Sequence, residues 1–316
     1  MTVASSSPVI PTGVPLIFER LRPDPGTVVL APAGAAPDAW LQAGDALRHH
    51  GCVRYAIDAG WLVGCAEVDD RDGMQAAAHR AYSDLFALLA AGDTPHLLRL
   101  WNYFPGINGD GGGVERYRQF NAGRQQAFIE AHRSAFEGSP AACALGTAGG
   151  PLRVYFIAGR TPPLAIENPR QVSAYRYPNA YGPRSPTFSR AAIAPLGDGR
   201  TMLFISGTAS IVGHETMHVG DVRRQTEESL VNIDAVRAVA ADRAGAPFPH
   251  EALTYTVYVR RPADLPVVRM VFDATVGARA AANAIYLQAD ICRAELLVEI
   301  EAHGGVATPT FDETAP

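Results

Sequence analysis

Residues 291–305 read ICRAELLVEIEAHGG, and the apolar run within them predicts a β-strand close to the C-terminus. Glu299 and Glu301 stand two positions apart in this strand. Because successive side chains of a strand point to opposite faces, both carboxylates must lie on the same face. That face is then either exposed to solvent, or one of its two carboxylates takes part in chemistry.

The segments that precede this strand predict a unit of strands and helices. Strands are expected at residues 201–213, 252–260, 283–293 and 296–302, the last two as an antiparallel closing pair. A helix is expected directly after Asp221, whose carboxylate can accept a hydrogen bond as the N-cap. A second helix is expected over residues 262–275, with Pro262 near its first turn.

The first half of the chain shows a similar order of elements. Strands are expected within residues 52–68 and 96–108, and helices at 71–92 and 114–136. The helix over residues 71–92 has an apolar stripe made of Met74, Ala77, Ala78, Ala81, Leu85, Leu88 and Leu89. The repeated order predicts an α+β fold of two related units, each a mixed β-sheet with helices packed on one face. We expect a first domain at residues 1–150 and a second at 151–316, divided near the Gly149-Gly150 pair.

The composition excludes several classes of function. The chain has 316 residues, a net charge of −5 and 27 basic residues, all of which are arginine. A chain without lysine cannot form a lysine Schiff base, hold pyridoxal phosphate through one, or build a Walker-type phosphate loop. The negative charge argues against nucleic acid and anionic membranes as partners. Nothing in the composition indicates an obligate protein partner.

The cysteines and the N-terminus indicate the compartment. The four cysteines are far apart and form no CxxC pair, which argues against a metal or disulfide framework and favours a reducing environment. Residues 1–18 show no basic segment followed by a long apolar run, so neither a signal peptide nor a membrane span is expected. We therefore expect a cytoplasmic protein.

The sequence GHETMH places His214, Glu215 and His218 in the zinc-protease pattern. In that chemistry both histidines lie on one face of a helix and bind zinc, and the glutamate acts as the base. Here Gly213 and Gly220 bracket the motif, which directly follows a strand and precedes the expected helix. A loop with ordinary polar histidines is therefore favoured over a zinc site, and no metal is expected.

A long segment at residues 173–193 is dense in tyrosine, arginine, proline and serine, and its aromatic content argues against disorder. Guanidinium groups bind carboxylates through paired, charge-assisted hydrogen bonds, so Arg184 in this segment is a candidate for binding an acidic ligand. The alternative is that Arg184 is solvated or paired with an acidic side chain. Small residues at 206–209 would let a ligand or a neighbouring backbone approach closely, or form a tight bulge.

Several of these segments together resemble known families. GDVRRQTEESLVNIDAVRAV, ALTYTVYVRRPADLP and LLVEIEA resemble the reactive-intermediate deaminase, or YjgF-like, fold. The longer motifs LRLWNYFPGIN, ERYRQFNAGR, YRYPNAYGPRSPTFSRA, FISGTASIVGHETMHVGD and ADICRAELLVEIEA cover most of the chain and are together similar to the chorismatases. The resemblance implies two YjgF-like (chorismate mutase-like) domains, with the ligand pocket mainly in the C-terminal half.

The resemblance also implies a reaction. Chorismatases cleave the enolpyruvyl ether of chorismate to pyruvate, and neither a metal nor an organic cofactor is implied. Cleavage begins with protonation of the terminal methylene carbon, which needs a positioned acid. Glu299 is the candidate acid, because an apolar strand raises the pKa of a carboxyl group. Glu301 is expected to be structural.

Further site residues follow from the same resemblance. The candidate substrate-binding residues are Arg184, Arg160, Tyr175, Tyr181, Thr208 and Ala209. Cys292 is a second candidate catalytic residue, since a cysteine at this position resembles the branch that forms 3-hydroxybenzoate and in some members also 4-hydroxybenzoate. Ala209 instead resembles the hydrolytic branch, which forms a dihydroxycyclohexadiene carboxylic acid. We expect 3-hydroxybenzoate; the alternative from another class is a YjgF-like imine deaminase or small-ligand-binding protein.

Overall fold

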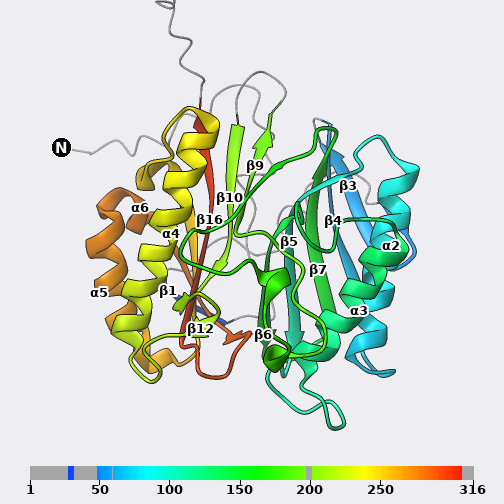
Figure 1. The fold of residues 1–316 in the computed structure, drawn as a ribbon, viewed down its shortest axis with the longest axis horizontal. Coiled ribbons are helices and arrows are strands. Elements are labelled where there is room, and N and C mark those ends of the chain that lie inside the picture. The colour runs from blue at the N-terminus through cyan, green and yellow to red at the C-terminus, as the bar shows by residue number, and fades with distance from the viewer. Residues whose placement is uncertain (1–27, 32–47, 59, 197–200, 308–316) are drawn as a thin grey trace, which may run out of the picture.

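The computed structural model describes residues 28–31, 48–58, 60–196 and 201–307. Two seven-stranded sheets stand face to face, and each carries its helices on the face that points away from the other sheet (Figure 1). The chain therefore has the α+β organisation that the repeated order of elements predicts. Among the described residues, no helix combines the length and the apolar character needed to cross a membrane.

The first sheet is built mainly from the N-terminal half of the chain. Its order is β15 (Asp290–Ile291), β6 (Ala141–Thr147), β5 (His96–Pro105), β7 (Leu152–Gly159), β4 (Trp61–Val68), β3 (Val53–Asp58) and β2 (Arg48–His50). Helices α2 (Met74–Ala91) and α3 (Arg116–Glu130) cover its outer face. Every residue of the predicted apolar stripe of α2 is buried, so this helix is confirmed in position and orientation.

The second sheet is built mainly from the C-terminal half. Its order is β1 (Val28–Ala31), β14 (Ile285–Gln288), β13 (Leu253–Val259), β16 (Val298–Ala307), β10 (Thr201–Thr208), β9 (Ala191–Pro195) and β8 (Leu164–Ile166). Its outer helices are α4 (Val222–Ala244), α5 (Leu265–Val276) and α6 (Ala278–Ala282). Asp221 caps α4 by accepting a hydrogen bond from the backbone N–H of Arg224 at 3.1 Å, as predicted.

Three apolar cores hold these layers together. Two of them lie between a sheet and its own helices. The third lies between the two sheets and contains side chains from both, including Trp61, Tyr155, Phe204 and Leu287. The inner faces of both sheets are therefore buried, and any polar group on them must find a partner or line a cavity.

Both expected closing strands are present in the second sheet, but they are not neighbours. β14 and β16 do not pair with each other, because β13 lies between them; β14 runs parallel to β13 and β16 antiparallel to it. β15, which follows β14, leaves this sheet and pairs with β6 of the other one. Short apolar strands give no local signal that distinguishes one neighbour from another.

The two sheets do not divide at residue 150. Gly149 and Gly150 connect β6 and β7, which flank β5 in the same sheet, so this glycine pair is a turn within the first unit. β1 and β15 each join the sheet built mainly from the other half of the chain. We therefore propose that the units meet after Gly159. Residues 1–18, on which the expectation of no signal peptide rested, lie outside the described residues.

Candidate active site

A cavity of about 290 Å³ opens between the two halves of the chain. Its walls come from the start of α3, from the segment 171–190, from the end of β10 with the following residues, and from the segment 292–299. The pocket is therefore not confined to the C-terminal half, since Tyr117 and Arg118 of α3 also line it. Its volume suits a small molecule.

The carboxyl group of Glu299, in β16, lines this cavity. Its side chain is buried, and among the described residues it has neither a hydrogen-bond partner nor an ion-pair partner. Burial, followed by the charge of Glu301, raises the pKa of Glu299 to about 8, against the opposing effect of Arg99 and Arg260. Glu299 is therefore mainly a neutral acid at pH 7, with a proton to donate.

Glu301 lies on the same face of β16 but has a different environment. It accepts hydrogen bonds from Trp101 Nε1 at 2.9 Å and from the Tyr258 hydroxyl at 3.1 Å, and it forms a buried ion pair with Arg99. Trp101 and Arg99 belong to β5, so this carboxylate joins the two sheets. The two carboxylates thus share a face, as predicted, while one lines the cavity and the other is fully engaged in the inter-sheet core.

Cys292 also lines the cavity, seven residues before Glu299. Burial, followed by the charge of Glu299, raises the pKa of the Cys292 thiol to about 12. The thiolate is the nucleophilic form of cysteine, so Cys292 is a protonated thiol and a poor nucleophile at neutral pH. It can still act as a weak donor close to the acid.

Two cavity arginines keep donor capacity. Arg293 lies 4.0 Å from the centre of the Tyr181 ring, and its Nη1 donates to the backbone oxygen of His214 at 2.9 Å. Arg190 donates through Nη2 to the Tyr177 hydroxyl at 2.8 Å. Arg293 Nη2 and Arg190 Nε are buried and have no partner among the described residues. Arginine donors of this kind suit a carboxylate.

The structure brings four of the predicted site residues together. Glu299, Cys292, Tyr181 and Ala209 all line the cavity. Thr208 lies beside it, buried, with its hydroxyl donating to the backbone oxygen of Ser206 at 2.7 Å.

The other three predicted residues lie elsewhere. Arg160 is exposed and forms an ion pair with Asp93, Arg184 is exposed and bonds Gln125 at 3.3 Å, and Tyr175 packs against the ring of Phe136. The expected binding arginines are thus replaced in the cavity by Arg190 and Arg293. The sequence offered no signal to choose among them, because the cavity combines segments that are far apart in the chain.

Residues 214–218 lie in a loop, which is the interpretation that the sequence favoured over a zinc-protease helix. The motif lies at a β-hairpin made of β11 (Ile211–Val212) and β12 (Glu215–Thr216), and it contains no helix. His214 faces the Tyr181 hydroxyl at 3.3 Å, whereas His218 faces Glu228 of α4 at 3.4 Å. The two histidines therefore have separate partners, as ordinary polar side chains of a loop.

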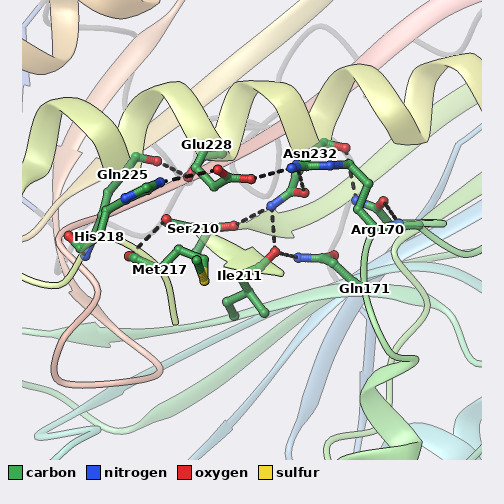
Figure 2. Close-up of polar contacts among 12 residues, drawn as sticks. Arg170, Gln171, Ser210, Ile211, Met217, His218, Gln225, Glu228 and Asn232 are labelled. Carbon is green, nitrogen blue, oxygen red and sulfur yellow. Dashed lines mark hydrogen bonds and ion pairs between the residues drawn. The ribbon is translucent and has the colours of Figure 1, made fainter. Parts of the chain in front are cut away.

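Helix α4 holds two walls of the cavity through buried amide side chains. Asn232 donates to the backbone oxygens of Ala209 at 3.1 Å and Ile211 at 2.9 Å (Figure 2). Gln225 donates to the backbone oxygen of Glu295 at 3.0 Å and accepts from the N–H of Leu297 at 2.8 Å. The apolar periodicity of α4 predicts the face of the helix that is buried, but it does not predict Gln225 and Asn232 on this face. Their role is to hold the backbone of the two cavity walls.

The cavity thus combines a buried carboxyl group of raised pKa, Glu299, with two arginines in its wall, Arg190 and Arg293. The family model described as Chorismatase FkbO/Hyg5-like, N-terminal, matches residues 38–158. A 3-hydroxybenzoate synthase of Streptomyces hygroscopicus is 39% identical over 279 residues, which are 84% of this chain and 81% of that protein. A chorismatase of Streptomyces rapamycinicus is 38% identical over 261 residues, covering 80% and 77% of the two chains.

The fold agrees with these relationships. The crystal structure of a chorismatase superposes with a TM-score of 0.77 at 36% sequence identity, covering 82% of this chain and 79% of that one. The chain belongs to the chorismatase family of enzymes.

Proposed function

We propose that this enzyme cleaves the enolpyruvyl ether of chorismate and releases pyruvate and 3-hydroxybenzoate. The observation that carries the proposal is Glu299, a buried carboxyl group without hydrogen-bond partners that lines the cavity and is protonated at neutral pH. The relatives named as a 3-hydroxybenzoate synthase and as chorismatases support the same substrate.

The chemistry requires an acid of this kind. Transfer of the Glu299 proton to the terminal methylene carbon of the enolpyruvyl group generates an oxocarbenium ion. The carboxylate that remains stays close to this cation and stabilises it, because burial keeps the local dielectric low. The ring C3–O bond then breaks and the ether oxygen leaves with pyruvate. The C4 hydroxyl oxygen bridges to C3, its bond to C4 opens, and loss of the C3 hydrogen as a proton aromatises the ring and restores the Glu299 acid. The two products together contain all the atoms of chorismate.

Binding of chorismate requires local positive charge. The substrate carries two carboxylates, and the protein as a whole has a net charge of −5. Arg293 and Arg190 supply guanidinium groups in the cavity wall, each with one buried nitrogen that lacks a partner among the described residues. We assign the substrate carboxylates to these two arginines.

Arg293→Ala is expected to raise the KM for chorismate by about 10- to 100-fold, with a smaller effect on kcat, because charge-assisted hydrogen bonds to the bound substrate are lost. Arg293→Lys keeps the charge but loses the planar fork, and an intermediate KM is expected. The matched comparison is Arg184→Ala, which removes an exposed arginine outside the cavity lining and should leave KM unchanged. If KM rises in Arg184→Ala and not in Arg293→Ala, the substrate carboxylate is bound by Arg184, as the sequence predicted, and not by Arg293.

The product identifies the branch of the reaction. Cys292 and Ala209, which resemble different branches, both line the cavity. The hydrolytic branch consumes one water molecule per chorismate, whereas the aromatising branch consumes none overall. We propose 3-hydroxybenzoate as the main product, with 4-hydroxybenzoate as a minor one, because a cysteine at position 292 resembles this branch and a relative at 39% identity is named as a 3-hydroxybenzoate synthase.

The test is complete turnover of chorismate, with pyruvate measured through lactate dehydrogenase and the ring products separated by chromatography. We expect one pyruvate per chorismate and a dominant peak of 3-hydroxybenzoate. A dihydroxycyclohexadiene carboxylic acid would instead assign the hydrolytic branch. Failure of the folded protein to release pyruvate would contradict the proposal, and ammonia release from imines would then favour the deaminase alternative.

The compartment also stays a prediction. All four cysteines are free: Cys52, Cys65, Cys143 and Cys292. Free thiols are the usual state in a reducing compartment, which supports the proposed cytoplasmic location.

A further inference from the structure

The strand that faces Glu299 contains an irregularity. In the ladder between β10 and β16, Ile205 pairs with Ala302 and Thr208 pairs with Ile300. Two residues of β10, Ser206 and Gly207, thus stand opposite the single residue Glu301 of β16. This is a β-bulge, a feature that redirects side chains and is frequent beside active sites. The sequence offered a bulge or a close approach at these small residues, and the structure contains both.

The close approach is made by the proposed acid. A Cβ atom added to Gly207 would lie 1.9 Å from Oε1 and 2.7 Å from Cδ of Glu299, and 3.0 Å from Cβ of Cys143. The φ angle of Gly207 lies outside the left-handed region, so the backbone itself does not require glycine here. What the position requires is space, because the Glu299 carboxyl group occupies the volume that a side chain would fill.

Ser206 fixes the bulge in place. Its N–H donates to the backbone oxygen of Arg190 at 3.0 Å, and its hydroxyl donates to Ser189 O at 2.6 Å. The same hydroxyl accepts from the N–H of Ala142, in β6 of the other sheet, at 2.9 Å. Ser206 is fully buried, so moving the bulge would leave these buried polar groups without hydrogen-bond partners, which is unfavourable.

We infer that Gly207 is a positioning residue for the acid: the bulge holds open a slot in which the Glu299 carboxyl group lies, and it ties this slot to the backbone of the cavity residue Arg190. The inference rests on the proposed role of Glu299. A methyl group at position 207 cannot be relieved by a shift of the anchored bulge, and Cys143 lies on its other side. The flexible carboxyl group must therefore move, and it loses its place relative to the carbon that it protonates.

Gly207→Ala is expected to lower kcat for pyruvate release by about 100-fold, since a displacement of about 1 Å has effects of this size. KM should change much less, because Arg190 and Arg293 keep their places. The descending limb of the pH profile should move to lower pH, because the displaced carboxyl group is less deeply buried. Unchanged kcat and an unchanged pH profile would overturn the inference.

A second background makes the test specific. Glu299→Asp withdraws the carboxyl group by one methylene, so Gly207→Ala should cause little further loss when added to it. The same fold loss in both backgrounds would show that Gly207 does not act through the acid.

The matched control is Gly64→Ala in β4. There an added Cβ would lie 2.6 Å from Cζ of Phe156 and 2.7 Å from the backbone oxygen of Arg54, so it also disturbs a packed strand. Gly64→Ala should lower the melting temperature and leave the pH profile as it is. If the pH profile of Gly64→Ala also shifts, the shift in Gly207→Ala is explained by general destabilisation of the fold and not by displacement of the acid.

The outcome is separable from that of the proposed function. If Glu299→Gln retains turnover, the proposed acid is wrong whatever Gly207→Ala does. If Glu299→Gln is inactive while Gly207→Ala matches the wild type, only the positioning role is wrong.

Discussion

Glu299→Gln is expected to reduce pyruvate release from chorismate by about 10²- to 10⁴-fold, the usual contribution of a positioned general acid. Glutamine has the same shape as the protonated carboxyl group but cannot give up a proton to carbon at a useful rate. KM should stay close to that of the wild type, since the arginines of the cavity are untouched. The coupled pyruvate assay measures the loss, and circular dichroism checks that the fold is retained.

The pH dependence gives the same variant a second readout. With a raised pKa of about 8, Glu299 is protonated below that value, so kcat/KM for the wild type should be level up to about pH 8 and fall above it. Residual activity of Glu299→Gln should lack this descending limb. Turnover near that of the wild type, with the limb intact, would remove Glu299 from the role of acid.

Stability should follow the same titration. The folded state binds the Glu299 proton up to about pH 8, whereas an unfolded chain releases it near the ordinary glutamate pKa of 4.5. Stability from this group is therefore complete below about pH 4.5 and is lost as the pH rises through 8. The glutamine of Glu299→Gln does not titrate. The free energy of unfolding of this variant, relative to that of the wild type, should therefore increase as the pH rises from about 4.5 to about 8. Denaturant titrations at pH 5 and pH 8.5 measure the difference.

Local patterns in the sequence predicted what depends on local physics. The period of two in β16 placed Glu299 and Glu301 on one face, the helical stripe from Met74 to Leu89 identified the buried side of α2, and Asp221 marked the start of α4. Each of these rests on residues within a few turns or positions of one another.

Distant partners decided the rest. Nothing in the segment around Glu301 indicates its partner Arg99, which lies 202 positions away in the chain. The sequence therefore offered no physical reason why Glu301 forms an ion pair and Glu299 does not. For the same reason the cavity arginines could not be chosen. Arg184 is exposed, and Arg293 lines the cavity because the hairpin β11–β12 holds its guanidinium group.

Glu301→Gln is expected to lower the free energy of unfolding by about 3–5 kcal/mol, because it leaves Arg99 as a buried charge without its counter-ion. Arg99 is 1% exposed, and its Nη1 already lacks a partner among the described residues, so the environment offers no replacement. Asp93→Asn breaks the exposed ion pair with Arg160 and should cost less than about 1 kcal/mol. Urea titrations of the two variants under the same conditions make the comparison.

Glu301→Gln should also change catalysis, through the pKa of Glu299. The charge of Glu301 is the second cause of the raised pKa of Glu299, after burial, while Arg99 acts against it. Removing the carboxylate and keeping the guanidinium should lower the pKa of Glu299, so the descending limb of kcat/KM should move to lower pH. If the limb stays in place while stability falls, Glu301 serves the inter-sheet contact alone.

A double variant separates the two effects. Arg99→Met combined with Glu301→Gln removes both charges, so it should recover part of the stability lost in the single variant, because no buried charge is left unpaired. It also removes the opposing influence of Arg99 on Glu299, so the descending limb should return toward higher pH. A double variant that is less stable than Glu301→Gln would show that Arg99 contributes through its packing on the Trp101 ring, 4.9 Å away, more than through its charge.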